Sequence, residues 1–119
     1  MENNRMEQLE ALEIMSGFND KLLRNLPILA GELDGFKRND TDTYLQSMLD
    51  VINWITSVIG ATLDVLNEGR ERFDKAAFNS ALTNINEAAA AGDDTKTAES
   101  LRKIIPCFEA LKTAIKEVV

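Results

Sequence analysis

Histidine is absent from this chain of 119 residues, and there is only one cysteine, Cys107. Histidine is the usual general base at neutral pH and the usual zinc and haem ligand, so its absence excludes histidine-dependent catalytic triads and the Glu-x-x-His pairs of di-iron bundles. A lone cysteine excludes an internal disulfide and is typical of a reducing compartment. The sequence therefore predicts no catalytic residue, no metal ligand and no cofactor.

Basic residues are also few, with 13 Lys and Arg against 20 Asp and Glu and a formal net charge of -7. Binding to nucleic acid or to an anionic membrane surface needs clustered positive charge. The best candidates are only pairs, each near acidic neighbours: Lys37-Arg38, Arg70 with Arg72, and Arg102-Lys103. We therefore expect no nucleic-acid partner and no membrane partner.

Long uncharged apolar runs are missing, since no stretch of about 18 such residues occurs, and this excludes a transmembrane helix. The first residues, Met1 to Arg5, lead into an acidic amphipathic pattern instead of the apolar core of a secretory signal. The expected location is the cytosol.

Proline and glycine are scarce as well, at two and six residues, while 45% of residues are hydrophobic and 28% are charged. No segment alternates apolar and polar residues as a strand would, and the apolar residues recur at helical spacing. Three short breaks, at 37–41, 67–70 and 92–95, contain Asn, Asp, Thr or Gly, which end or cap helices. We predict one all-α domain over 1–119, an antiparallel up-down-up-down four-helix bundle with helices over 5–37, 41–67, 72–91 and 95–118.

A proline interrupts the first and the last of these helices. Pro27 and Pro106 each remove an amide donor, and this predicts a kink in both helices, or at Pro27 a short break. Gly31 and Gly35 either allow close helix packing or loosen the end of the first helix. The apolar stripe of that helix is Leu9, Leu12, Met15, Leu22, Leu26, Leu29, Leu33 and Phe36.

The second helix has no Lys or Arg and carries two adjacent apolar stripes that cover more than half of its circumference. A helix that is apolar on so wide an arc must be covered on more than one side, by its own bundle, a second subunit or a bound segment. Trp54 either packs in the core or anchors a partner. The candidate protein interface consists of Val51, Trp54, Ile55 and Val58.

Other polar groups have simpler explanations than chemistry. Glu7, Glu10 and Glu13 form a solvated helix face, because hard cations need oxygens that converge from several elements. Cys107, beside Phe108, is expected to be a small core residue without an imidazole to activate it. The run Asp93-Asp94-Thr95 lacks the later ligands of a calcium loop and is better explained as helix capping.

The run Gly92-Asp93, Ala98, Leu101, Ile105-Pro106 and Glu109 follows an alanine-rich helix. It resembles the C-terminal helical hairpin of an uncharacterised family of small proteins from Firmicute bacteria. Asp94 stands where that family tends to have an aromatic residue, and the proline is displaced by one position. The resemblance implies no activity.

These observations leave two functional classes, with an enzyme a distant third. The first is a helical protein-interaction module that self-associates, as a homodimer, through the second predicted helix. The second is a cytosolic chaperone or adaptor, of the flagellar or secretion type, that binds an amphipathic helix of a partner protein.

Overall fold

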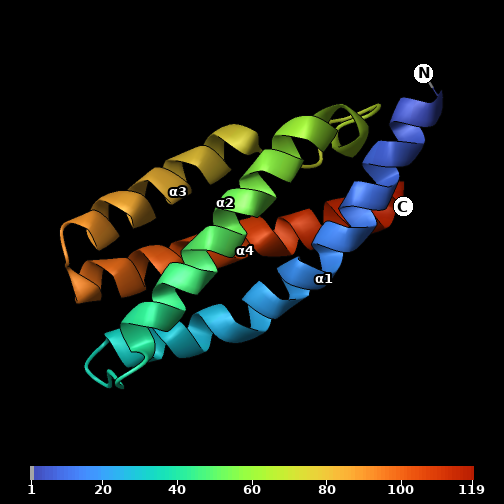
Figure 1. The fold of residues 1–119 in the computed structure, drawn as a ribbon. Helices are drawn as coiled ribbons and strands as arrows, with labels where there is room; N and C mark the ends of the chain where they lie inside the picture. The colour runs from blue at the N-terminus through green and yellow to red at the C-terminus, as the bar shows by residue number, and fades with distance from the viewer. Residues whose placement is uncertain (1) are drawn as a thin grey trace.

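The computed structural model describes residues 2–119, with side chains from residue 4 onward. Within this range the chain forms four helices and no strand: α1 (Glu2–Leu33), α2 (Thr41–Leu66), α3 (Lys75–Ala90) and α4 (Asp94–Val118). They run in alternating directions along an elongated molecule of 49 × 23 × 20 Å (Figure 1). The predicted all-α four-helix bundle is confirmed.

The helices do not pack equally around the bundle. α1 lies against both α2 and α4, α3 lies against α4, and α2 makes only a light contact with α4. Figure 1 shows α2 crossing α4 at an angle and diverging from α3. Short connections predicted that consecutive helices would be close neighbours; among the described residues this holds for α1 with α2 and for α3 with α4, but not for α2 with α3.

α1 ends four residues before the predicted boundary. Gly35 has a φ of 110°, a left-handed conformation that glycine adopts without strain, and the amide of Phe36 then donates to the carbonyl of Glu32 (2.9 Å). The helix therefore stops at Leu33. Phe36 was predicted to continue the apolar stripe, but it lies beyond the helix end and is 77% exposed.

Aspartate side chains fix the starts of α3 and α4. Asp74 accepts a hydrogen bond from the amide of Ala77 (3.0 Å), so α3 begins at Lys75 and not at the predicted residue 72. Asp93 accepts one from the amide of Lys96 (3.0 Å), as the capping explanation of Asp93-Asp94-Thr95 predicted.

Both prolines lie inside continuous helices. α1 runs without interruption through Pro27, and α4 through Pro106, so the alternative of a break at Pro27 is wrong. Figure 1 shows that α1 bends along its length as it passes α2 and α4. A kink placed at either proline stays a prediction.

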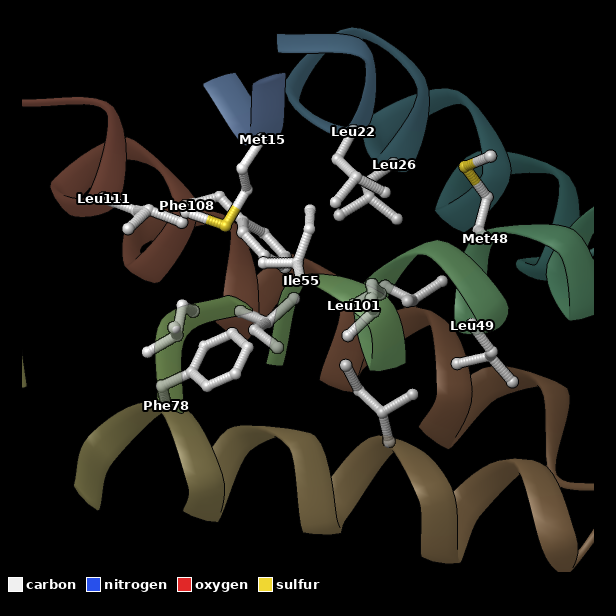
Figure 2. Close-up of a cluster of buried hydrophobic side chains, with 14 of the residues drawn as sticks. Met15, Leu22, Leu26, Met48, Leu49, Ile55, Phe78, Leu101, Phe108 and Leu111 are labelled. Carbon is white, nitrogen blue, oxygen red and sulfur yellow. The ribbon is translucent and has the colours of Figure 1, made fainter. Parts of the chain in front are cut away.

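One hydrophobic core runs through the bundle, and all four helices contribute to it. Figure 2 shows Met15, Leu22 and Leu26 of α1 converging with Ile55 of α2, Phe78 of α3, and Leu101, Phe108 and Leu111 of α4. The rings of Phe78 and Phe108 meet edge to face, with their centroids 5.7 Å apart. Aromatic and aliphatic side chains therefore fill the space between the four helices.

Candidate interaction surface

The helices α1 and α2 expose apolar side chains where they lie side by side. Phe18 of α1 and Trp54 of α2 meet edge to face, with ring centroids 5.0 Å apart. They remain 42% and 40% exposed, although they pack against each other. Ile14, one helical turn before Phe18, is 61% exposed. This is more exposed apolar and aromatic surface than the sequence predicted for α1.

A shallow hollow of about 320 Å³ opens beside this aromatic pair. Its lining consists of Phe18, Asp50, Val51 and Trp54. Val58 lies one turn beyond Trp54 on α2 and is half-buried, as is Val51. We call the surface made by these apolar side chains the seam patch: Ile14, Phe18, Val51, Trp54 and Val58.

The predicted interface residues fall into two groups. Trp54, Val51 and Val58 all have surface in the seam patch, and Trp54 is a surface residue and not a core residue. Ile55 is completely buried among the residues of the core and offers no surface to a partner, so its assignment to the interface is wrong. On a helix, Ile55 points about 100° away from Trp54, and Figure 2 shows it among core side chains of α1 and α4.

Sequence reasoning missed Ile14 and Phe18. Both lie beside the leucine stripe of α1, and an apolar residue in that position is normally taken as an edge of the core. Their spacing of four residues places them on one face of the helix, outside the stripe. That second short apolar row is the signal in the sequence that identifies them.

Metal binding and thiol chemistry depend on the Asp, Glu and Cys side chains that the structure describes. No group of three or more potential metal ligands occurs in this part of the chain. Cys107 is half-buried, and burial, with a smaller contribution from Asp74, raises the pKa of its thiol. A raised pKa keeps the thiol protonated and makes it a poor nucleophile.

Two of the other hollows lie at the end of the bundle that holds the α1–α2 and α3–α4 turns. One lies beside Phe36 and Ile28, where Arg102 pairs with Asp34 (2.7 Å). The other is polar and lies between α3 and α4. In both, the polar side chains are solvated or already paired, so neither hollow holds a set of converging groups like that of an enzyme site.

By length and composition alone, α2 is the one helix among the described residues that could cross a membrane. The absence of an uncharged run therefore does not exclude a membrane span, because a span tolerates one or two charged residues. In the structure the most apolar side of α2 packs against α1 and α4 within the core, and core helices meet the same criterion of length and composition.

The chain matches a known protein family. The sequence model described as a domain of unknown function (DUF8042) matches residues 10–114, a range that includes most of all four helices. The chain belongs to the DUF8042 family. No curated protein and no solved structure matches it.

The DUF8042 match, which covers residues 10–114, confirms that the chain belongs to an uncharacterised family. The specific resemblance of the C-terminal hairpin stays a prediction. An origin in Firmicute bacteria stays a prediction. The DUF8042 description gives no activity, so the function has to be argued from the surface of the molecule.

Proposed function

We propose that this DUF8042 protein is a non-enzymatic protein-interaction module that self-associates as a homodimer through the side of the bundle where α1 and α2 meet. The exposed pair Phe18 and Trp54 carries this proposal. Large aromatic side chains are costly to leave in water, and they dominate the energetics of protein interfaces. Contiguous apolar surface on a small domain is typical of a binding site.

Self-association needs no second gene product, and for that reason we prefer it to an unknown partner. The proposal includes a cytosolic location, which agrees with the single, half-buried Cys107. It assigns no metal, cofactor or nucleic acid, because the chain has no histidine and a formal net charge of -7.

The substitution Trp54→Glu tests the proposal. A carboxylate at position 54 stays hydrated in the monomer, where the side chain is already partly exposed, but it would be desolvated in a dimer interface at a cost of several kcal/mol. Light scattering at micromolar concentration should show a dimer for the wild type and a folded monomer for the variant. Phe36→Glu is the matched control, because Phe36 is an exposed aromatic residue outside the seam patch, and it should remain dimeric.

A wild-type monomer would contradict self-association, and an apolar dye then separates the remaining classes. The seam patch and its hollow beside Val51 also suit the apolar face of a partner helix, as a chaperone or adaptor would need. A monomer that binds the dye, and binds less of it after Trp54→Glu, would favour the chaperone. A monomer that binds no dye would defeat both classes of protein binding.

A further inference from the structure

The solvent-facing side of α1 carries a sequence pattern that is symmetric about Gly17. Counted outward from Gly17 in either direction, exposed residues recur after four, three and then four positions. With Gly17 itself they make seven residues, and this spacing keeps all of them on one side of the helix. We call this surface the outer face of α1: Met6, Glu10, Glu13, Gly17, Lys21, Arg24 and Ile28.

The charge of the side chains on the outer face changes sign at Gly17, from negative to positive. Glu10 and Glu13 lie on the N-terminal side of Gly17, and Lys21 and Arg24 lie at matching distances on the C-terminal side. An exposed apolar residue, Met6 or Ile28, lies at each end. If two copies of α1 run antiparallel about a two-fold axis at Gly17, the acidic residues of one copy face the basic residues of the other. The apolar residues at the ends of the two copies then face each other as well.

No side chain from residue 4 onward forms an ion pair with these charges. Among the side chains that the structure describes, ion pairs connect other residues, such as Lys112 with Asp20 and Lys37 with Asp42, but none includes the four charged residues of the outer face. All four are exposed and free to meet a second molecule. The complementary pattern is thus available to a partner that carries the same sequence in the opposite direction.

Gly17 allows such a partner to come close. A Cβ atom added at this position would meet nothing within 4 Å, and the residue lies inside a regular helix. Helices pack with their axes about 8 to 10 Å apart, and Cα atoms lie about 2.3 Å from the axis. Facing Cα atoms at a two-fold axis would therefore be roughly 3.5 to 5.5 Å apart.

We propose that a second copy of this chain packs antiparallel along the outer face of α1, with the two-fold axis at or near Gly17. In this arrangement Glu10 and Glu13 face Arg24 of the partner subunit and Lys21 of the partner subunit. The inference rests on the proposed function, since it specifies the geometry of the self-association. Ile14, which neighbours both Gly17 and Phe18 on the helix, connects this contact to the seam patch.

Cysteine cross-linking tests the position and direction of the contact. With Cys107→Ala as the background, Gly17→Cys should form a disulfide-linked dimer under mild oxidation, because the expected Cα separation overlaps the range of about 4.4 to 6.8 Å that a disulfide spans. Gly31→Cys is the matched control on the same helix, since an added Cβ there also meets nothing within 4 Å. Two copies of residue 31 in an antiparallel pair would be about 42 Å apart, so this variant should not cross-link.

Charge reversal tests the ion pairs. Glu10→Lys with Glu13→Lys gives one variant, and Lys21→Glu with Arg24→Glu gives another. Each variant alone places like charges opposite each other and should raise the dimer dissociation constant by about tenfold or more at low salt. An equimolar mixture of the two should restore dimerisation, because each altered pair then meets its complement.

Remote charge reversals control for net charge. Glu71→Lys with Glu87→Lys matches the first variant, and Lys96→Glu with Lys103→Glu matches the second; all four positions are exposed and lie outside α1. Both controls should dimerise as the wild type does. If the change of net charge alone weakened dimerisation, the control variants would dimerise as poorly as the outer-face variants, and that result would overturn the inference.

Several outcomes separate this inference from the proposed function. A dimer that is lost in Trp54→Glu but neither cross-links through Gly17→Cys nor responds to charge reversal would overturn the antiparallel geometry and leave the proposed function intact. Cross-linking through Gly31→Cys would indicate parallel helices and would also overturn it. A wild type that stays monomeric would overturn both.

Discussion

Replacing Asn19 with leucine should leave the protein as stable as the wild type or make it more stable. Asn19 is completely buried between α1 and α4, and its side-chain amide donates to the carbonyl of Phe108 (3.0 Å). Its side-chain oxygen is equally buried, but no donor among the described residues reaches it. The side chain therefore makes one hydrogen bond and leaves one polar atom without a protein partner.

The expected change in the free energy of unfolding follows from the amide and the oxygen of the Asn19 side chain. A buried polar atom without a partner costs about 1 to 3 kcal/mol, and one hydrogen bond contributes about 0.5 to 1.5 kcal/mol to stability. Leucine branches at the same position as asparagine and adds apolar contacts, while its larger methyl groups introduce some crowding. The net change in the free energy of unfolding should lie between zero and an increase of about 2 kcal/mol.

Asn67 provides the matched comparison for the same substitution. Its side-chain oxygen accepts hydrogen bonds from the amides of Arg72 and Phe73, and its side-chain amide donates to the carbonyl of Phe73. All three bonds organise the α2–α3 connection. Asn67→Leu should therefore destabilise the protein by about 2 to 4 kcal/mol.

Urea unfolding followed by circular dichroism measures both variants, and an unchanged m value shows that midpoints report stability. The expected result is opposite or clearly unequal shifts of the midpoint for Asn19→Leu and Asn67→Leu. If Asn19→Leu destabilises the protein as much as Asn67→Leu does, the oxygen of Asn19 has a partner such as a buried water, and the reasoning about this core position is refuted.

Three further predictions concern charge, thiol chemistry and metal content. Lys37 pairs with Asp42 (2.8 Å) and Asp94 (3.2 Å), and these hydrogen bonds raise the pKa of its ammonium group. Because the pKa of Lys37 is higher in the folded state, its protonated form stabilises the folded state at every pH below the unfolded pKa of about 10.4. This stabilisation is lost as the pH rises through the pKa of Lys37 in the folded state. Lys37→Met should therefore lower the urea midpoint at pH 7 more than at pH 11, and an equal loss at both values would show that the pairing does not contribute. The thiol of Cys107, whose pKa burial raises, should react more slowly with a disulfide reagent at pH 8 in the folded protein than in urea; equal rates would contradict its protection. Protein purified without a tag should contain no stoichiometric transition metal by elemental analysis, and one zinc or iron per chain would refute the argument from the missing histidine.

The helices themselves could be predicted because their signals are local. The spacing of Leu22, Leu26 and Leu29 fixes the buried side of α1, and Asp93 placed after Gly92 gives both the end of α3 and the start of α4. Phe36 shows where local pattern fails. It continues the apolar spacing of α1, but the left-handed conformation of Gly35 ends the helix before it.

The candidate surface was harder to predict, because exposure depends on which helix lies beside which. The two apolar stripes of α2 indicated that part of this helix would be left uncovered, and Trp54 is indeed partly exposed. The sequence could not show that Ile55 turns into the core or that Phe18 would meet Trp54 from α1. Both outcomes follow from the pairing and rotation of α1 and α2, which involve residues far apart in the chain.

Sedimentation velocity of the wild-type protein over a series of concentrations measures self-association without any substitution. At micromolar concentration we expect a species of twice the 13.2 kDa chain mass. Its dissociation on dilution should increase at high salt, because salt screens the ion pairs of the outer face. A single species of 13.2 kDa at every concentration and every salt would contradict self-association.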